Sequence, residues 1–477
     1  MSSMGVEAGR GRQLSQEGGG RVVIHAVGLG LVWAWIYCVS VTPSIATGGV
    51  GIDPTSVEWL TSSLANVVAL FVCGFLFRSR PSGRVSVVLA GVIPALGTVT
   101  ISLSEDIGWL LALGGLACGL GYAMLCVLWG VALSRLEIEQ AEIAAPGACV
   151  VWMACALVFP SITGAAGVVG TSLMPLLSAV LLHATAKAAG RPGATGALQA
   201  DEAAPTAAGV FRPGSFIRLC LALCATYVVI GLLDVVNDCT PLVVGPANVD
   251  LLNFLGSGFG VAMAAAFVAF NVRVDAGRLY RWLVPVLMLG LAFCARGGSG
   301  GSALSTVICT GADVCVQAMA ILCVFAIHRD EGLSVALGIG CAQGFIQLGV
   351  LVGNALGAGA FNLVVGAGGL EAQAALVLGC VLCCFAALVP QTGRRRADEQ
   401  PDPSVAIEAV AARYRLTQRE TEVLDLLAQG RTQPYIRDVL QLSKGTVATH
   451  AAHIYAKLGV HSKQELIDLV EAEKGAE

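Results

Sequence analysis

One carboxylate and three amide side chains lie inside long apolar runs of this sequence. Asp313 occurs in the run TVICTGADVCVQAMAILCVF, and Gln317 follows it by four residues. Gln343 and Gln347 form a second pair at the same spacing in the next apolar run. Side chains four residues apart lie on one face of a helix, so each pair presents two polar groups in one direction. The pattern predicts a polar site for a small ligand or a proton, with interhelical hydrogen bonding as the alternative.

A second polar segment, near the end of the chain, carries cations scattered among small residues. From Arg413 to Lys463 the sequence holds eight basic and four acidic residues, a local surplus of positive charge. Phosphate contacts supply much of the affinity of proteins for DNA, and they need cations of this kind. An ordinary solvated surface is the alternative for each of them. The candidate phosphate-binding side chains are Arg431, Arg437, Lys444, His450, His453, Lys457 and Lys463.

Residue sets that serve catalysis or metal binding are missing from the sequence. All 17 cysteines lie between Cys38 and Cys384, and no CxxC pair has a second pair or a histidine at the spacing of a zinc site. We find no Ser-His-Asp set and no phosphate-binding loop in the hydrophilic part. The sequence therefore predicts a protein that is not an enzyme and that needs no cofactor or metal.

The composition divides the chain into two parts. Of its 477 residues, 56% are hydrophobic and 13% are charged, whereas a soluble domain carries about 25% charged residues. The mean hydropathy is +0.77. Residues 22–390 are almost continuously apolar, and residues 391–477 have an ordinary soluble composition. This division predicts an integral membrane domain followed by a hydrophilic tail.

Twelve apolar stretches are long enough to cross a bilayer, for which a helix needs about 20 residues. They form two groups of six, separated by the Ala-, Gly- and Pro-rich linker 188–214. The expected fold is all-α: a twelve-helix transmembrane bundle in two six-helix halves, plus a small four-helix domain in the tail. The expected spans are 22–45, 59–77, 85–103, 108–134, 144–162, 166–187, 215–236, 249–271, 279–295, 302–327, 333–357 and 370–390.

The placement of arginine and lysine indicates the orientation of these spans, because cytoplasmic loops collect positive charge. All basic residues of the membrane part except Arg296 fall on one side of the predicted bundle. Both termini are therefore expected in the cytoplasm. The expected boundaries are 1–21 for an N-terminal segment, 22–390 for the membrane domain, 391–412 for a linker with a lead-in helix, and 413–477 for the tail domain.

The tail carries helix start and stop signals at close intervals. Thr417 with Glu420, and Ser462 with Glu465, match the capping-box pattern of a helix N-terminus. Together with the remaining signals they predict a compact domain of four short helices. Those remaining signals are Gly430, Thr432, Pro434, Ser443 and Gly459.

These signals belong to a longer pattern that resembles the LuxR-type helix-turn-helix family over about residues 413–473. The resemblance implies that residues 432–440 form the supporting helix and residues 443–458 the recognition helix, which enters the major groove of double-stranded DNA. The matching residues are Leu416, Thr417, Arg419, Glu420, Glu422, Val423, Leu424, Leu427, Ala428, Gly430, Ile436, Ser443, Gly445, Thr446, Val447, His450, Ile454, Lys457, Leu458, Gly459, Val460 and Ser462.

The membrane part resembles the major facilitator superfamily in its layout of six plus six spans with a central cytoplasmic linker, over roughly residues 22–390. The basic segment FRSRPSGR, from Phe77 to Arg84, is similar to the loop that this family carries between its second and third spans. The family's acidic residue before that loop is absent here. The resemblance implies two six-helix bundles around a central cavity.

The predicted recognition helix departs from the LuxR pattern on the face that would meet DNA. Ala448 and Ala452 occupy outward positions where this family often carries lysine. We therefore expect weak-to-moderate DNA affinity for one domain, and binding as a homodimer. The inward face contains Val447, Ala451, Ile454 and Leu458. The expected DNA-binding residues are Lys444, Gly445, Thr446, Ala448, Thr449, His450, Ala452, His453 and Lys457.

The two resemblances together predict a membrane-bound, one-component transcription regulator in the bacterial inner membrane. Its expected partners are double-stranded DNA, the lipid bilayer, a small-molecule ligand and a second copy of the chain. A transporter with a regulatory tail is the alternative, and a tail that binds protein in place of DNA is a third hypothesis.

Overall fold

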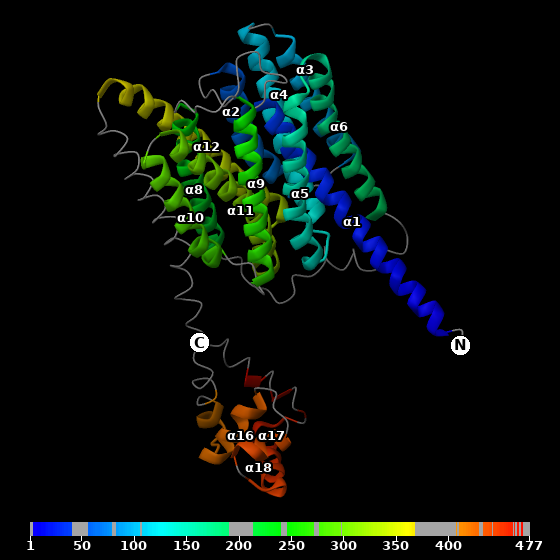
Figure 1. Cartoon of the computed structure of the whole chain (residues 1–477). Coiled ribbons are helices and arrows are strands. Elements are labelled where there is room, and N and C mark those ends of the chain that lie inside the picture. The colour runs from blue at the N-terminus through cyan, green and yellow to red at the C-terminus, as the bar shows by residue number, and fades with distance from the viewer. Residues whose placement is uncertain are drawn as a thin grey trace. The chain divides into compact units, whose positions relative to one another are not determined.

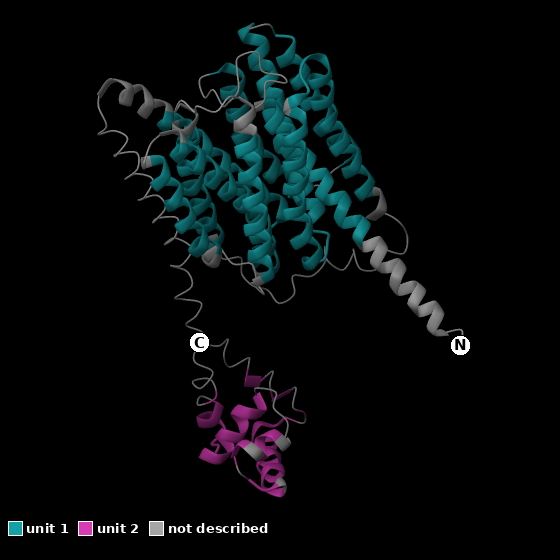
Figure 2. Cartoon of the chain, viewed as in Figure 1, with its two compact units in different colours: residues 1–391 teal, residues 392–477 magenta. Residues whose placement is uncertain are grey.

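Two compact units, each with its own apolar core, make up the chain in the computed structural model (Figures 1 and 2). The first comprises residues 1–391 and the second residues 392–477. The structure describes residues 3–40, 56–78, 83–104, 107–189, 213–239, 246–270, 276–296, 298–367, 407, 410–428, 433–440, 442–460, 462, 465–466 and 469–470. Every regular element within these ranges is a helix.

The first unit is a bundle of helices that run alongside one another (Figure 1). Within the described ranges, ten helices are long and apolar enough to cross a membrane, with mean hydropathies of 1.8 to 2.3. A shorter apolar helix, Leu279–Cys294, adds to them. The elements are α1 (Ser3–Ser40), α2 (Val57–Phe77), α3 (Arg84–Ser102), α4 (Gly108–Leu133), α5 (Ile138–Val158), η1 (Phe159–Ser161), α6 (Gly164–Ala189), α8 (Pro213–Cys239), α9 (Pro246–Phe270), α10 (Ala276–Arg296), α11 (Gly298–Glu331) and α12 (Val335–Ala367).

These helices account for the expected spans up to residue 357, whereas the expected span 370–390 lies outside the described residues. The count of twelve therefore stays a prediction. The helix α5 begins at Ile138, before the expected span 144–162, and ends at Val158. Glu137 is its N-cap and Glu139 lies in its first turn, where the helix dipole favours a negative charge. Acidic residues that precede the apolar run therefore begin this helix.

Large apolar side chains cover outer faces of this unit. On α2, the side chains of Leu64, Val68, Val72 and Phe75 are 47–62% exposed at helical spacing. A soluble monomer rarely exposes apolar patches of this extent, but lipid solvates them. Helices also satisfy their backbone hydrogen bonds internally, as a lipid environment demands. The first unit is thus the membrane part of a multi-pass membrane protein.

Glycine brings α8 and α12 into direct backbone contact. A methyl group at Gly353 would lie 2.4 Å from the carbonyl oxygen of Val228, and one at Gly349 would lie 2.5 Å from that of Cys224. The two helices therefore meet without intervening side chains. Gly357 continues the row one turn further along α12, where an added methyl group would meet Val235 at 2.9 Å. The four-residue glycine spacing is thus explained by helix packing.

The second unit contains the helices α16 (Gln418–Ala428), α17 (Gln433–Leu440) and α18 (Lys444–Leu458), with α18 packed against the other two. The predicted inward face of the third helix is confirmed, because its four apolar residues are at most 5% exposed. Short helical pieces at 407, 410–413, 465–466 and 469–470 flank these helices. The count of four helices stays a prediction. The core residues are Ile407, Val410, Val423, Leu424, Leu427, Ile436, Val447, Ala451, Ile454, Leu458, Val460, Leu466 and Val470.

Candidate functional site

The first candidate region lies in the membrane unit, where α11 packs against α8 and α12. Tyr227 of α8 donates its phenolic hydrogen to Oδ1 of Asp313 in α11, over 2.6 Å. Gln317 lies one turn along α11 from Asp313. Nε2 of Gln343 in α12 donates to Oε1 of Gln317 over 3.2 Å. Two of the four residues predicted for the membrane site are thus joined by a hydrogen bond, and a third, Asp313, lies one turn away and is bonded to Tyr227.

Gln347, the fourth predicted residue, lies one turn beyond Gln343 on α12 and is half-buried. The structure shows no hydrogen bond between Gln347 and Asp313, Gln317 or Gln343. Asp313 is also half-buried, although its neighbours Ala312 and Val314 have no exposed surface. Asp313 therefore keeps some accessible surface among the packed helices.

The charge of Asp313 has no cationic partner within the described part of the chain. None of the ion pairs between described residues involves Asp313. On α8 the basic residue Arg218 precedes Tyr227 by nine positions, which is about 14 Å along a helix axis. Within the described residues, the hydrogen bond to the Asp313 carboxyl group comes from a neutral donor, the Tyr227 hydroxyl.

Aromatic side chains complete the surroundings of Asp313. Tyr122 of α4 and Tyr227 are 3% and 1% exposed, and both lie close enough to Asp313 to feel its charge. Tyr227 was not among the residues predicted from the sequence, because a tyrosine in an apolar run usually serves only to pack against its neighbours. The available signal was that Tyr227 is the single tyrosine of its apolar run.

The second candidate region is α18, and its ends were predicted correctly. Ser443 has an extended backbone, and its Oγ accepts a hydrogen bond from the amide of Thr446 over 3.1 Å. Gly459 adopts a left-handed conformation with φ 68°, which a residue without a Cβ enters without strain. The predicted signals Gly430 and Thr432 lie outside the described residues.

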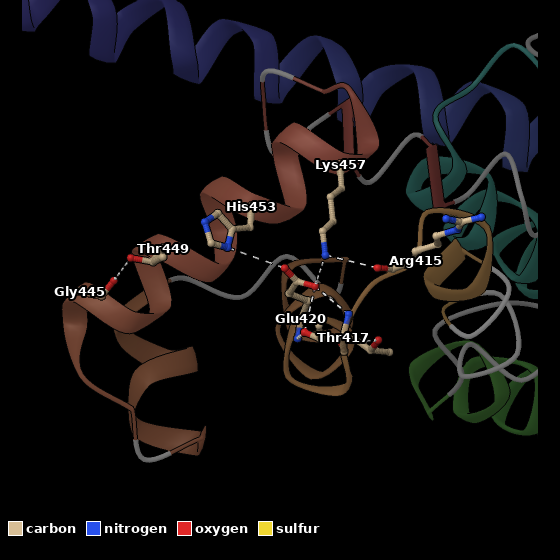
Figure 3. Close-up of polar contacts among 8 residues, drawn as sticks. Arg415, Thr417, Glu420, Gly445, Thr449, His453 and Lys457 are labelled. Carbon is tan, nitrogen blue, oxygen red and sulfur yellow. Dashed lines mark hydrogen bonds and ion pairs between the residues drawn. The ribbon is translucent and has the colours of Figure 1, made fainter.

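The Glu420 carboxylate, only 4% exposed, joins the beginning of α16 to the last turn of α18 (Figure 3). Its Oε2 accepts from the Thr417 amide at 2.7 Å and from the Thr417 hydroxyl at 2.9 Å, which confirms the predicted capping box. The same oxygen receives the Lys457 ammonium at 2.6 Å. Lys457 Nζ also donates to the carbonyl oxygen of Arg415 over 3.3 Å. The sequence analysis missed this link.

These contacts lower the pKa of the Glu420 carboxyl. The hydrogen bond from Lys457 is the largest cause, followed by the backbone amide of Thr417, and together they outweigh burial and bring the pKa from 4.5 to about 2. His453 Nδ1 lies 3.9 Å from Oε1 of the same carboxylate and pairs with it when protonated. Glu420 is therefore ionised at neutral pH.

The outer face of α18 carries small side chains. Ala448, Thr449, Ala452 and Ala456 are all exposed. The Thr449 hydroxyl donates to the Gly445 carbonyl oxygen of its own helix over 2.9 Å (Figure 3). The expected absence of long side chains on this face is thus seen in the structure.

The remaining predicted DNA-binding residues occupy different places. His453 is exposed and His450 is half-buried. The Lys457 side chain is 36% exposed, and its ammonium is engaged by Glu420. The side chain of Lys444, and the residues Arg431 and Lys463, lie outside the described residues. No contact with DNA is tested by these positions, so the set stays a prediction.

Comparison with known proteins identifies the second unit. Residues 414–470 match the family model described as "Bacterial regulatory proteins, luxR family". The tail therefore contains a LuxR-type helix-turn-helix domain.

Curated proteins match over the same kind of short segment. The "Uncharacterized response regulatory protein YgeK" of Escherichia coli strain K12 is 48% identical over 64 residues, 13% of this chain and 44% of that protein. "Fimbriae Z protein" of Salmonella typhimurium strain LT2 is 47% identical over 53 residues, 11% of this chain and 25% of that protein. "Oxygen regulatory protein NreC" of Staphylococcus aureus strain JH9 is 43% identical over 53 residues, 11% and 24% of the two chains. The chain thus spans less than half the length of these relatives.

Solved structures match the first unit in fold. The major facilitator superfamily transporter FucP, in its outward conformation, gives a TM-score of 0.50 at 11% sequence identity. A bacterial homologue of the iron transporter ferroportin, in its outward-facing state, gives 0.55 at 15% identity. Each match covers 78% of this chain and 98% of the solved one. The membrane unit has a fold like that of the major facilitator superfamily, and identities this low show the fold alone.

Proposed function

We propose that this protein is a membrane-bound, one-component transcription regulator. The observation that carries the proposal is the presence of a LuxR-type domain and a multi-pass membrane unit in one chain. Relatives of the tail are named as response-regulatory and oxygen-regulatory proteins. In this chain the segment before the tail is a membrane bundle, so the input is expected there.

The proposed input is a small ligand that binds at Asp313, Gln317, Gln343 and Gln347. A ligand shifts the balance between two states only if it binds them with different affinities. We expect such a difference from the hydrogen bonds of Tyr227 with Asp313 and of Gln343 with Gln317, because they depend on three helices keeping their positions. Movement of one helix would break them.

The proposed output is DNA binding through α18, which enters the major groove as a recognition helix. Its small outer residues, Ala448 and Ala452, allow the helix to approach DNA closely, but their side chains have no group that can hydrogen-bond to a base. The Thr449 hydroxyl already donates within its own helix, so its methyl group is the part offered to a thymine methyl. Phosphate contacts then come from the rim, where Lys444, His450, His453 and Lys457 are proposed anchors.

The cellular arrangement completes the proposal. The membrane domain extends over residues 22–390, with a linker at 188–214, and the DNA-binding domain over 413–477. Residues 1–21 form an N-terminal cytoplasmic segment, and residues 391–412 link the membrane domain to the DNA-binding domain. Both termini lie in the cytoplasm, and the protein resides in the bacterial inner membrane. A homodimer on DNA compensates for the weak single domain, because two linked contacts raise the effective concentration.

A transporter with a regulatory tail is the second candidate function. It is favoured by the fold likeness to a protein named as a major facilitator superfamily transporter. The two functions give different phenotypes for Asp313→Asn: loss of uptake in a transporter, and altered promoter output with unchanged uptake in a regulator.

The decisive experiment is genome-wide crosslinking of the intact protein to the chromosome. We expect enrichment at discrete promoters, and loss of that enrichment in a chain that ends before residue 397. A gel shift with residues 397–477 on an enriched promoter supplies the direct test. Ala448→Lys should tighten binding about threefold to tenfold and steepen the dependence on salt by about one counterion. Absence of promoter enrichment would refute the proposal.

A further inference from the structure

The hydrogen bonds around Asp313 all run toward its carboxyl group. The Tyr227 hydroxyl donates to Oδ1, and Gln343 donates to the Gln317 oxygen. With that oxygen occupied as an acceptor, Gln317 keeps its amide hydrogens as donors one turn from Asp313 on α11. Such a directed chain suits a carboxylate, which only accepts hydrogen bonds, better than a protonated acid, which also donates one.

An ionised carboxylate in this position needs a positive charge. Charged groups inside a bilayer are costly, and those that persist are paired. Among the described residues none supplies the pairing cation to Asp313. For the described part of the chain this leaves two possibilities: Asp313 is protonated, or a bound cation pairs with its carboxylate.

Two further features favour a bound cation that also donates hydrogen bonds. Oε1 of Gln343 is buried and has no hydrogen-bond partner, although its residue is only 1% exposed. A buried acceptor left unmatched is costly and indicates a missing donor. Asp313 is half-buried and so keeps some accessible surface among the packed helices.

The aromatic surroundings indicate the kind of cation. Tyr227 contacts Asp313 through its hydroxyl, and aromatic rings close to a carboxylate favour organic cations. Ca²⁺ and Mg²⁺ take about six or more oxygen ligands from carboxylates, carbonyls and waters, and Zn²⁺ takes about four ligands, mostly histidine and cysteine. No group of three or more His, Cys, Asp or Glu side chains suitable for a metal occurs in the part of the chain that the structure describes.

We propose that the site formed by Asp313, Tyr227, Gln317 and Gln343 binds a small organic ammonium ion. Its charge lies against the Asp313 carboxylate, an N–H group reaches the free acceptor of Gln343, and its apolar part rests on the tyrosines. This inference rests on the proposed function, for which it names the class of ligand. A proton on Asp313 in place of an amine is the competing occupant.

The test uses the full-length protein in phosphatidylcholine nanodiscs, with 2-phenylethylammonium as the probe and the neutral 2-phenylethanol as its matched control. Binding is measured by calorimetry and by the shift in melting temperature. We expect the amine to bind the natural chain, and the alcohol to bind at least tenfold more weakly. Asp313→Asn should abolish amine binding, and Tyr227→Phe should weaken it about tenfold, the factor that corresponds to the loss of one hydrogen bond.

Matched variants protect the result from misfolding. Asp234→Asn removes an acidic side chain that lies on α8 and not on α11 with Asp313, and it should leave binding unchanged. Asp313→Glu keeps the charge and should retain part of the affinity, whether or not Asp313→Asn folds. Equal binding of amine and alcohol, full amine binding by Asp313→Asn, or failure of the amine to bind would each overturn the inference.

Infrared spectroscopy separates the amine from the proton. A protonated Asp313 gives a carbonyl band that is absent from Asp313→Asn. Once the amine is bound, the natural chain should lack this band. Persistence of that band in the presence of the amine would mean that Asp313 holds a proton, and the inference would fail. None of these readouts involves DNA, so their failure differs from failure of the proposed function, which is seen as absence of promoter enrichment.

Discussion

Each unit of this chain holds a carboxylate in its helical interior, and the two carboxylates have opposite surroundings. Glu420 receives the Lys457 ammonium at 2.6 Å, whereas Asp313 receives the neutral Tyr227 hydroxyl at the same distance. The first charge is compensated within the chain and fastens two helices together. The second is not compensated by any described residue, which is the reason we propose it as a ligand site. The comparison teaches that a fixed cation within the chain distinguishes the structural carboxylate Glu420 from Asp313, which lacks one among the described residues.

The largest expected effect comes from removing the fixed cation. In residues 397–477, Lys457→Met should lower the free energy of unfolding by about 2–3 kcal/mol, because it leaves the Glu420 charge buried without its partner. Glu420→Gln should cost less, about 1–2 kcal/mol, since no charge is left behind. Urea denaturation measures both.

An exposed ion pair in the same unit provides the control. Arg419 lies 2.6 Å from Glu422, one turn along α16, and both side chains are well exposed. Arg419→Met should therefore cost less than about 1 kcal/mol. If Lys457→Met costs no more than this, Lys457 is not the partner that holds α18 in place.

Acid should weaken the tail in a window that Glu420 sets. The pKa of this carboxyl is about 2 in the folded chain, below its ordinary value of 4.5. The unfolded chain thus takes up the proton first, so the stabilisation is complete above the ordinary value and is lost as the pH falls toward about 2. Urea denaturation at successive pH values should show this decline in the natural tail and a smaller one in Glu420→Gln. Equal declines in both would contradict the assignment.

Removing the other charge should have the reverse sign. Asp313→Asn retains an acceptor for Tyr227 but eliminates an uncompensated charge, so the unliganded protein should become more stable, by about 1 kcal/mol. Thermal unfolding of the full-length protein in nanodiscs measures the change. A clear loss of stability would show that Asp313, like Glu420, has a structural role.

The smallest expected effect concerns the backbone that Lys457 contacts. Arg415 adopts a left-handed conformation with φ 51°, which costs a residue with a Cβ about 1–2 kcal/mol. Arg415→Gly should relieve this strain. The greater conformational entropy of glycine in the unfolded chain offsets part of the gain, so the free energy of unfolding should rise by about 0.5 kcal/mol. Arg415→Ala keeps the strain and should show no gain in the same urea measurement.

Local patterns predicted much of this molecule. The division into membrane and soluble parts follows from composition, and the ends of α18 follow from Ser443 and Gly459, since each signal acts within a few residues. The partners of the carboxylates were not predictable in this way. Lys457 is 37 positions from Glu420, and Tyr227 is 86 positions from Asp313. Helical periodicity identifies the face on which a residue lies, but the neighbour on another helix depends on how the helices pack.

The glycine contact between α8 and α12 has a mechanical consequence. Because backbone meets backbone at Gly349 and Gly353, one helix cannot slide along the other without first lifting off it. We therefore expect α8, which contains Tyr227, and α12, which contains Gln343, to move together as a rigid pair. A change at Asp313 would then displace both helices and would not be limited to the rotation of one side chain.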